Sequence, residues 1–225
     1  MEKSVLFICL TIFGYFIGQT IQKKTKIELI NPILFGIIFV IFLLQVFKVD
    51  VQTYQIGTKE FSYLLTPATI CLAVPLYENY VKIKKIFLII IISVLTGTIV
   101  NLFSIFILSK YFNFSQIEFA TILPKSVTTA IGVNISENIG GVTSLSIPII
   151  IITGVFGNLV AFPVLRSINI QSPISKGLGI GVSSHVIGTS KAIQNGTIEG
   201  AYSGISLILT GILTIFLAPV FSFLF

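Results

Sequence analysis

The distribution of charge constrains this chain more than any other feature. Most of its charge-free stretches match the ~20 apolar residues that a helix needs to cross the ~30 Å hydrocarbon layer of a bilayer. Charged residues make up 10% of the chain, far below the roughly 25% typical of soluble domains. The sequence therefore predicts an integral membrane protein. The stretches without Asp, Glu, Lys or Arg are residues 4–22, 29–47, 61–77, 86–109, 142–165 and 200–225.

We expect an all-α, polytopic protein with about seven or eight transmembrane segments, some of them broken or re-entrant. No part of the chain is long and polar enough to form a soluble domain, so one membrane domain over residues 1–225 is the simplest division. The segments around Pro67 and Pro124 both pair proline with Ser or Thr and end in Glu-Asn. This similarity leaves open an organisation in two related halves, residues 1–110 and 117–225.

The net charge of +6 is better explained by membrane topology than by binding of nucleic acid. Two lysine clusters, within residues 23–26 and 82–85, lie in short loops beside apolar stretches. Cytoplasmic loops of membrane proteins carry an excess of Lys and Arg. The clusters therefore predict cytoplasmic loops and an N-terminus outside. Beyond residue 109 the basic residues are scattered, so they predict no orientation for the second half.

Motifs of catalysis or cofactor binding do not support an enzyme. Ser183, Ser184 and His185 are adjacent, which does not direct a hydroxyl at the imidazole, and the only Asp, Asp50, lies in a loop. No dinucleotide fingerprint or phosphate-binding loop is present, and we expect no cofactor. A single histidine without Cys or carboxylate neighbours at ligand spacing is a poor metal site. Cys9 and Cys71 lie inside apolar stretches, and we expect them to be buried packing residues.

Three segments interrupt the pattern of regular membrane helices. Residues 61–80 contain two prolines, which predict a kinked or broken helix. Residues 118–141 hold only 11 uncharged residues between Lys125 and Glu137, too few for an ordinary span. Residues 177–200 are rich in Gly, Ser and Thr and contain the lone His185. Polar residues at membrane depth are costly unless they face protein or an aqueous cavity, so these segments indicate a path for something hydrophilic.

Interrupted helices present free N-termini, which hold anions through unpaired N–H groups and a partial positive charge. Transporters with discontinuous helices use such ends near the membrane midplane. Hydroxyl groups could add donors there, although in helices they also bond back to their own carbonyls. The residues that we expect along a substrate path are Thr66, Pro67, Thr69, Pro124, Lys125, Ser126, Thr128, Thr129, Ser183, Ser184, His185, Thr189 and Lys191.

Ionisable residues in these segments favour a small anion as the substrate. Lys125, His185 and Lys191 supply positive or titratable groups within otherwise uncharged regions. Glu137 and Glu199 could neutralise them or carry a coupling proton. For both lysines the alternative is extension of the side chain to the membrane surface, and for His185 it is a structural hydrogen bond. Glu199 also lies between Gly196, Gly200 and Gly204, a small-residue ridge suited to close helix packing.

Four separated motifs occur in order over nearly the whole chain: TPATICLAVPLY from Thr66, LPKSVTTAIGVNISENIGG from Leu123, GLGIGVSSHVIGTSKA from Gly177 and EGAYSGISLILTGILTIFLAP from Glu199. Together they resemble the LrgB/CidB family. Ala130 departs from the proline expected after the paired threonines, and Ser190-Lys191 stands where Ala-Arg or Ser-Arg is frequent. Lysine cannot make the bidentate contacts of arginine.

The resemblance implies a multi-pass protein of the bacterial plasma membrane with a small holin-like partner of the LrgA/CidA type. It also implies one of two functions. One is transport of small carboxylates, such as pyruvate in bacteria or glycolate and glycerate in the related plant plastid protein. The other is holin-like or antiholin-like control of murein hydrolase activity and autolysis without transport. The residues favour transport of a monocarboxylate, by a single chain or a homo-oligomer.

Overall fold

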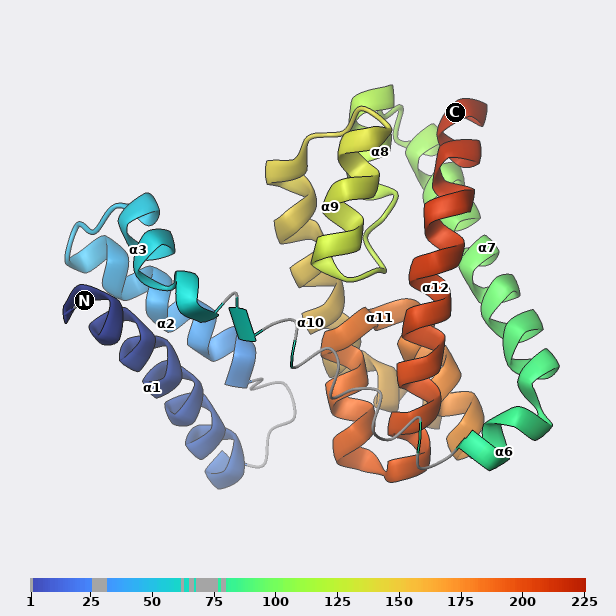
Figure 1. Ribbon diagram of the computed structural model, residues 1–225, viewed down its shortest axis with the longest axis horizontal. Coiled ribbons are helices and arrows are strands. Elements are labelled where there is room, and N and C mark those ends of the chain that lie inside the picture. The colour runs from blue at the N-terminus through green and yellow to red at the C-terminus, as the bar shows by residue number, and fades with distance from the viewer. Residues whose placement is uncertain (1, 26–31, 62, 65–66, 68–76, 78–79) are drawn as a thin grey trace. The chain divides into compact units, whose positions relative to one another are not determined.

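The computed structural model describes residues 2–25, 32–61, 63–64, 67, 77 and 80–225, and these form helices without any β-strand (Figure 1). The all-helical fold predicted from the sequence is confirmed. The chain divides into two compact units, Met1–Leu72 and Ala73–Phe225. The predicted kinked helix over residues 61–80 lies almost entirely outside the described residues, as do Thr66, Thr69 and Cys71.

Four described helices are long and apolar enough to cross a membrane, so the described spans do not reach the expected seven or eight. A fifth apolar helix, α2 (Pro32–Val46), is shorter. Two of the segments expected to be broken form helical hairpins rather than single long helices. The candidate spans are Ser4–Thr25, Phe87–Tyr111, Thr143–Ser167 and Thr197–Leu224.

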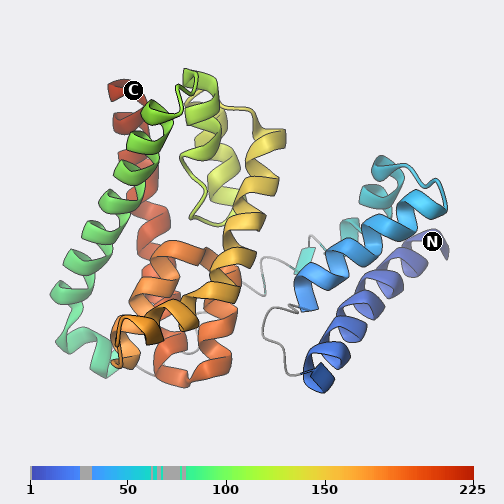
Figure 2. The ribbon, with the colours of Figure 1, turned by 180° about the vertical axis from the view of Figure 1, so that it is seen from behind.

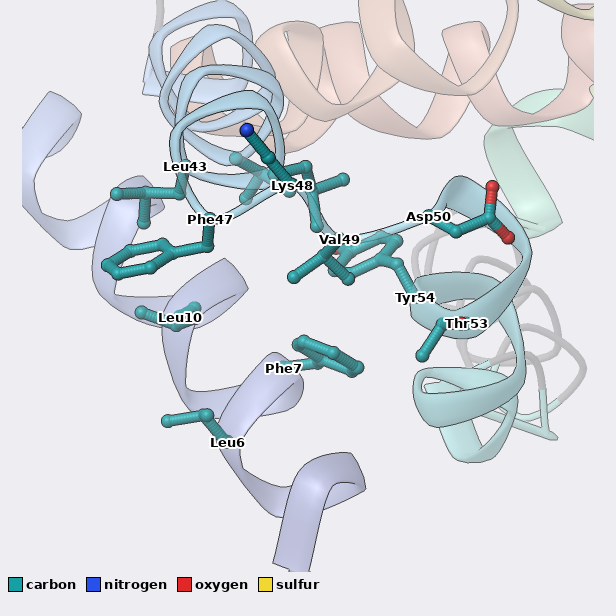
Figure 3. Close-up of a pocket in the computed structure, with 12 residues that line it drawn as sticks. Leu6, Phe7, Leu10, Leu43, Phe47, Lys48, Val49, Asp50, Thr53 and Tyr54 are labelled. Carbon is teal, nitrogen blue, oxygen red and sulfur yellow. The ribbon is translucent and has the colours of Figure 1, made fainter.

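The first unit consists of α1 (Glu2–Thr25), α2 and α3 (Val51–Gly57). Asp50 caps α3 by accepting a hydrogen bond from the Gln52 N–H at 3.0 Å. The Phe7 and Tyr54 rings meet edge to face, 5.5 Å apart. They border an apolar cavity of about 640 Å³, where Figure 3 shows side chains of all three helices. Cys9 is exposed, so its expected burial was wrong: an uncharged stretch does not reveal which helix face turns outward.

The second unit is built on three long helices, α7 (Phe87–Tyr111), α10 (Thr143–Ser167) and α12 (Thr197–Leu224), with the short α6 (Tyr80–Lys85) before them. Helices α7 and α12 run in the same direction. Near their starts Ile90 packs with Tyr202, and at their ends the Lys110 ammonium lies 4.1 Å from the centre of the Phe225 ring. Helix α10 runs the opposite way, as Figures 1 and 2 show.

A first helical hairpin, residues 116–138, joins the end of α7 to the start of α10. It consists of α8 (Gln116–Ile122), a non-helical tip, and α9 (Thr129–Asn138). The predicted interruption of this segment is confirmed. Ser115 and Glu118 form a capping box at the start of α8. The Ser146 hydroxyl of α10 lies 2.9 Å from the Thr121 carbonyl oxygen and 2.7 Å from the Ser136 hydroxyl, and so connects both arms to α10.

A second helical hairpin is formed by α11 (Pro173–Asn195), whose helical geometry breaks at His185. Its outgoing arm, residues 173–184, and its returning arm, residues 186–195, pack against each other. Ile180 and Ala192 share one core cluster, although twelve residues of straight helix would separate them by about 18 Å. Both arms also contact α12: Gly181 packs closely on Ser203, and Thr189 Oγ1 lies 2.8 Å from Ser203 Oγ.

The two hairpins enter the second unit from opposite ends. The first connects α7 to α10 at one end, and the second connects α10 to α12 at the other. Basic residues gather at the end where the second hairpin begins, and the other end carries Lys110 together with Glu118 and Glu137. The positive-inside rule predicts that such a basic end faces the cytoplasm. The described residues that mark this basic end are Lys84, Lys85, Arg166 and Lys176.

Candidate functional site

The tip of the first hairpin carries Lys125 into the second unit. Pro124 and Ser126, on either side of it, are buried. Leu123, before the proline, still has helical geometry (φ −50°, ψ −45°), but Pro124 lacks the backbone N–H that would continue the hydrogen bonds of α8. Thr128 then starts α9, and its hydroxyl accepts a hydrogen bond from the Ile131 N–H at 3.4 Å. Helix α9 therefore begins four residues after the lysine.

The Lys125 ammonium has polar neighbours but no counter-charge among the described residues. Its Nζ lies 3.4 Å from Asn101 Oδ1 on α7 and 3.4 Å from the Ser126 hydroxyl. Both are long for hydrogen bonds, and the side chain is half-buried. An ammonium at membrane depth is costly unless it is paired or faces water. Its surroundings are therefore suited to a mobile anion that supplies the missing charge.

The tip of the second hairpin is His185, and its backbone is unusual. It has φ 40° and ψ −142°, a combination that is largely restricted to glycine and that costs other residues of order 1–3 kcal/mol. The imidazole Nε2 donates a hydrogen bond to the Ile150 carbonyl of α10 at 2.8 Å. Because a carbonyl only accepts, this bond requires a proton on Nε2 and leaves Nδ1 as the acceptor of a neutral ring.

Helix α10 is shaped to receive this tip. A Cβ atom at Gly154 would overlap the His185 ring, and one at Gly157 would overlap the Ser184 hydroxyl. One residue after Gly157, Asn158 donates a hydrogen bond from Nδ2 to the Ile187 carbonyl at 2.9 Å. The two glycines thus permit close approach, and the polar contacts fix the orientation of the break.

Ile150 of α10 contacts both hairpins: its carbonyl oxygen bonds His185 Nε2, and a Cβ built at Gly132, in the first turn of α9, would overlap its side chain. The first turn of α9 and the first turn of the returning arm both begin at the tips of these hairpins. Helix N-termini present unpaired N–H groups and partial positive charge. The site therefore combines two helix starts, an unpaired ammonium and an imidazole, an arrangement that can hold a carboxylate.

A cavity of about 440 Å³ lies next to this site, between α7 and the outgoing arm of α11. Asn101 and Ser183 are among its lining residues. Ser183 was predicted from the sequence, but Asn101 was missed because it lies in the middle of an ordinary uncharged span. Spacing was the available signal: small or polar residues recur every fourth position on both helices, at Ser93, Gly97 and Asn101 and at Ser175, Gly179 and Ser183.

The remaining residues predicted along the substrate path differ in burial and in their position along the helices. Ser184 and Thr189 are buried, and Thr189 Oγ1 donates to the His185 carbonyl at 2.8 Å. Thr129 is the first residue of α9. Lys191 is half-buried on the returning arm, nearer to its end at Asn195 than to His185.

The two glutamates lie away from the hairpin tips along their own helices. Glu137 is exposed near the end of α9. Glu199 is buried in the first turn of α12 and accepts a hydrogen bond from Asn195 Nδ2 at 3.2 Å. Pro67 belongs to the first unit, where it is exposed.

Comparison with known proteins identifies similar sequences over almost the full length. The model of the LrgB-like family matches residues 11–224. The Holin-like protein CidB of Staphylococcus epidermidis is 38% identical over 99% of this chain and 97% of its own. The Antiholin-like protein LrgB of Bacillus cereus is 30% identical over 95% of this chain and 94% of its own. No solved structure matches significantly.

Proposed function

This chain belongs to the LrgB-like family of membrane proteins, and we propose that it moves small monocarboxylates, of the pyruvate and glycolate class, across the bilayer. The substrate binds where the two hairpin tips meet. Its carboxylate supplies the counter-charge that Lys125 lacks, and no covalent chemistry by the chain is needed.

The observation that carries this proposal is the environment of Lys125. Its ammonium lies 3.4 Å from one amide oxygen and one hydroxyl, with no carboxylate paired to it among the described residues. A bound carboxylate accepts hydrogen bonds from Nζ, from the Ser126 hydroxyl and from the first N–H groups of α9. Charge-assisted hydrogen bonds of this kind are stronger than neutral ones. A small anion is therefore favoured over a neutral molecule of the same size.

The opposed hairpins supply a means of exchange between the two sides of the membrane. Each tip is attached to its own end of the second unit by short arms, and the substrate lies between the tips. Transporters with discontinuous helices open such a central site to one side at a time. We propose the same for this chain in the bacterial cell membrane, with movement of one hairpin against α10 as the opening step.

Uptake into liposomes tests the proposal directly. The purified protein is reconstituted, and entry of labelled pyruvate, glycolate and lactate is followed under sodium and proton gradients of either sign. Lys125→Ala is compared with Lys176→Ala, which removes a lysine from the basic end and leaves the tips intact. The expected result is saturable uptake by the wild-type protein and by Lys176→Ala, with much weaker uptake by Lys125→Ala at the same low substrate concentration.

A second candidate function is favoured by the names of the relatives, Holin-like protein CidB and Antiholin-like protein LrgB. In this alternative the chain regulates murein hydrolase activity by associating with a small holin-like protein of the LrgA/CidA type, and transports nothing. The liposome assay is therefore repeated with that partner present. Absence of uptake by folded protein under every gradient, with the partner included, would replace transport by this regulatory function.

A further inference from the structure

We propose that the cavity between α7 and the outgoing arm of α11 is the aqueous route by which the carboxylate travels between the basic end of the second unit and Lys125. This inference rests on the proposed function and adds the end of the second unit from which the carboxylate reaches Lys125. It also assigns a role to residues on α7, a helix that the sequence alone marks only as an ordinary membrane span.

The lining residues of the cavity follow a regular spacing on both of its walls. Residues four positions apart lie on the same face of a helix. Each wall therefore presents a continuous row of small or polar side chains to the space of about 440 Å³ between the helices. The rows are Ser93, Gly97 and Asn101 on α7, and Ser175, Gly179 and Ser183 on α11.

The rows run from the basic end toward the hairpin tips. Ser93 lies in the second turn of α7 and Ser175 in the first turn of α11, next to Lys176. Eight residues further along each helix, or about 12 Å at 1.5 Å per residue, the rows end at Asn101 and Ser183. Asn101 Oδ1 is the atom that faces the Lys125 ammonium at 3.4 Å, so the inner end of the cavity borders the carboxylate site.

The chemistry of the rows suits a small hydrophilic solute rather than a lipid chain. The outer face of α7 carries apolar side chains such as Ile92 and Phe103, both more than half exposed, as expected for contact with lipid. The cavity face carries hydroxyls, an amide and glycines, with Val100, Leu178 and Val182 among them. A Cβ built at Gly179 would meet no atom within 4 Å, so this position borders open space rather than a packed neighbour.

Accessibility of introduced cysteines tests the route. Cys9 and Cys71 are replaced by Ser, and Ser175→Cys, Gly179→Cys and Ser183→Cys are made one at a time, with Ile92→Cys and Phe103→Cys as lipid-facing controls on α7. The probe is the membrane-impermeant anion 2-sulfonatoethyl methanethiosulfonate, added to one side of oriented vesicles. It reacts with a thiol only where water and an anion can reach.

We expect the three cavity cysteines to react from the basic side at least tenfold faster than the two controls. Excess pyruvate should slow the reaction of Ser183→Cys more than that of Ser175→Cys, because Ser183 lies at the inner end. Cavity cysteines that react no faster than the controls, or that react only from the other side, overturn the route. Each variant is first shown to be monodisperse in detergent, and the three positions serve as independent tests.

Uptake measured in the same vesicles separates this inference from the proposed function. If the wild-type protein transports carboxylates but the cavity cysteines stay unreactive, the route is wrong and the transport proposal stands. If the cysteines react and are not protected by pyruvate, and no uptake occurs, the cavity is water-filled and the transport proposal is wrong.

Discussion

The His185 imidazole is bonded to the Ile150 carbonyl at 2.8 Å from a backbone conformation that glycine would adopt with less strain. This bond fixes the break of α11 to the middle of the second unit and defines which ring nitrogen carries the proton. A glycine would make the same turn without the conformational cost, but it could not make the bond. The side chain of His185, rather than its backbone, is therefore the feature that the site requires.

Substitutions of His185 should separate the free-energy cost of its positive-φ backbone from the contribution of its imidazole to carboxylate uptake. We expect His185→Gly to be more stable than His185→Ala by about 1 kcal/mol, because alanine retains the strain of positive φ and glycine does not. Thermal unfolding in detergent measures this difference. Both variants should lose carboxylate uptake, since neither carries an imidazole. Equal stability of the two variants would contradict the strained conformation at this position.

Replacement of Lys125 should weaken carboxylate binding without lowering the stability of the fold. A hydrogen bond to a charged group contributes roughly 1.5–3 kcal/mol, so Lys125→Ala should raise the KM for pyruvate by about tenfold to a hundredfold. Lys125→Arg keeps the charge and should retain part of the affinity. Uptake as a function of pyruvate concentration measures both effects. An unchanged KM in Lys125→Ala would remove the residue from the binding site.

A carboxylate placed at position 101 should compete with the substrate. Asn101→Asp keeps the size of the side chain but puts a negative charge beside the Lys125 ammonium, where it forms an ion pair. We expect the KM for pyruvate to rise at least tenfold, and Asn101→Ser, which adds no charge, to have a smaller effect. Asn134→Asp on the exposed side of α9 is the control. An equal loss in Asn101→Ser would indicate that the shape of the side chain, rather than its charge, matters.

The glycines of α10 should tolerate no added methyl group. Gly157→Ala would push a Cβ into the Ser184 hydroxyl, and overpacking of this kind typically costs 1–3 kcal/mol. Gly179→Ala provides a matched control, because a Cβ there meets no atom within 4 Å and alanine favours helix. Thermal unfolding of both variants tests the expectation. A Gly157→Ala protein as stable as Gly179→Ala would show that the second hairpin does not pack on α10 as described.

The two helix interruptions could be predicted from the sequence because their polar residues interrupt apolar stretches. The interruption within residues 118–141 followed from the short uncharged length after Lys125, and that within residues 177–200 from the cost of polar groups at membrane depth. The exact position of the second break could not be predicted. Its glycines suggested the turn, yet they serve for packing, and the turn is made by His185, a residue with little intrinsic preference for positive φ.

Other features depend on contacts between distant residues, which periodicity does not reveal. Asn101 and Lys125 come together across the gap between α7 and the first hairpin, and nothing local in either segment indicates the pairing. The Ile150 carbonyl carries no sequence signal at all, because any residue would supply it. The described residues do not confirm the expected count of seven or eight spans. Hydropathy marks membrane-buried stretches, but it cannot distinguish a crossing from a hairpin that returns.

The contacts of α10 also impose an order on biosynthesis. Both hairpins rely on it: Ser146 satisfies polar groups of the first, and Ile150 and Asn158 hold the tip of the second. The first hairpin leaves the ribosome before α10 exists, so its polar tip has no support at membrane depth when it is made. The second hairpin emerges after α10 but before α12, on which both of its arms also pack. Each hairpin therefore completes its contacts only when the helix that follows it has been made.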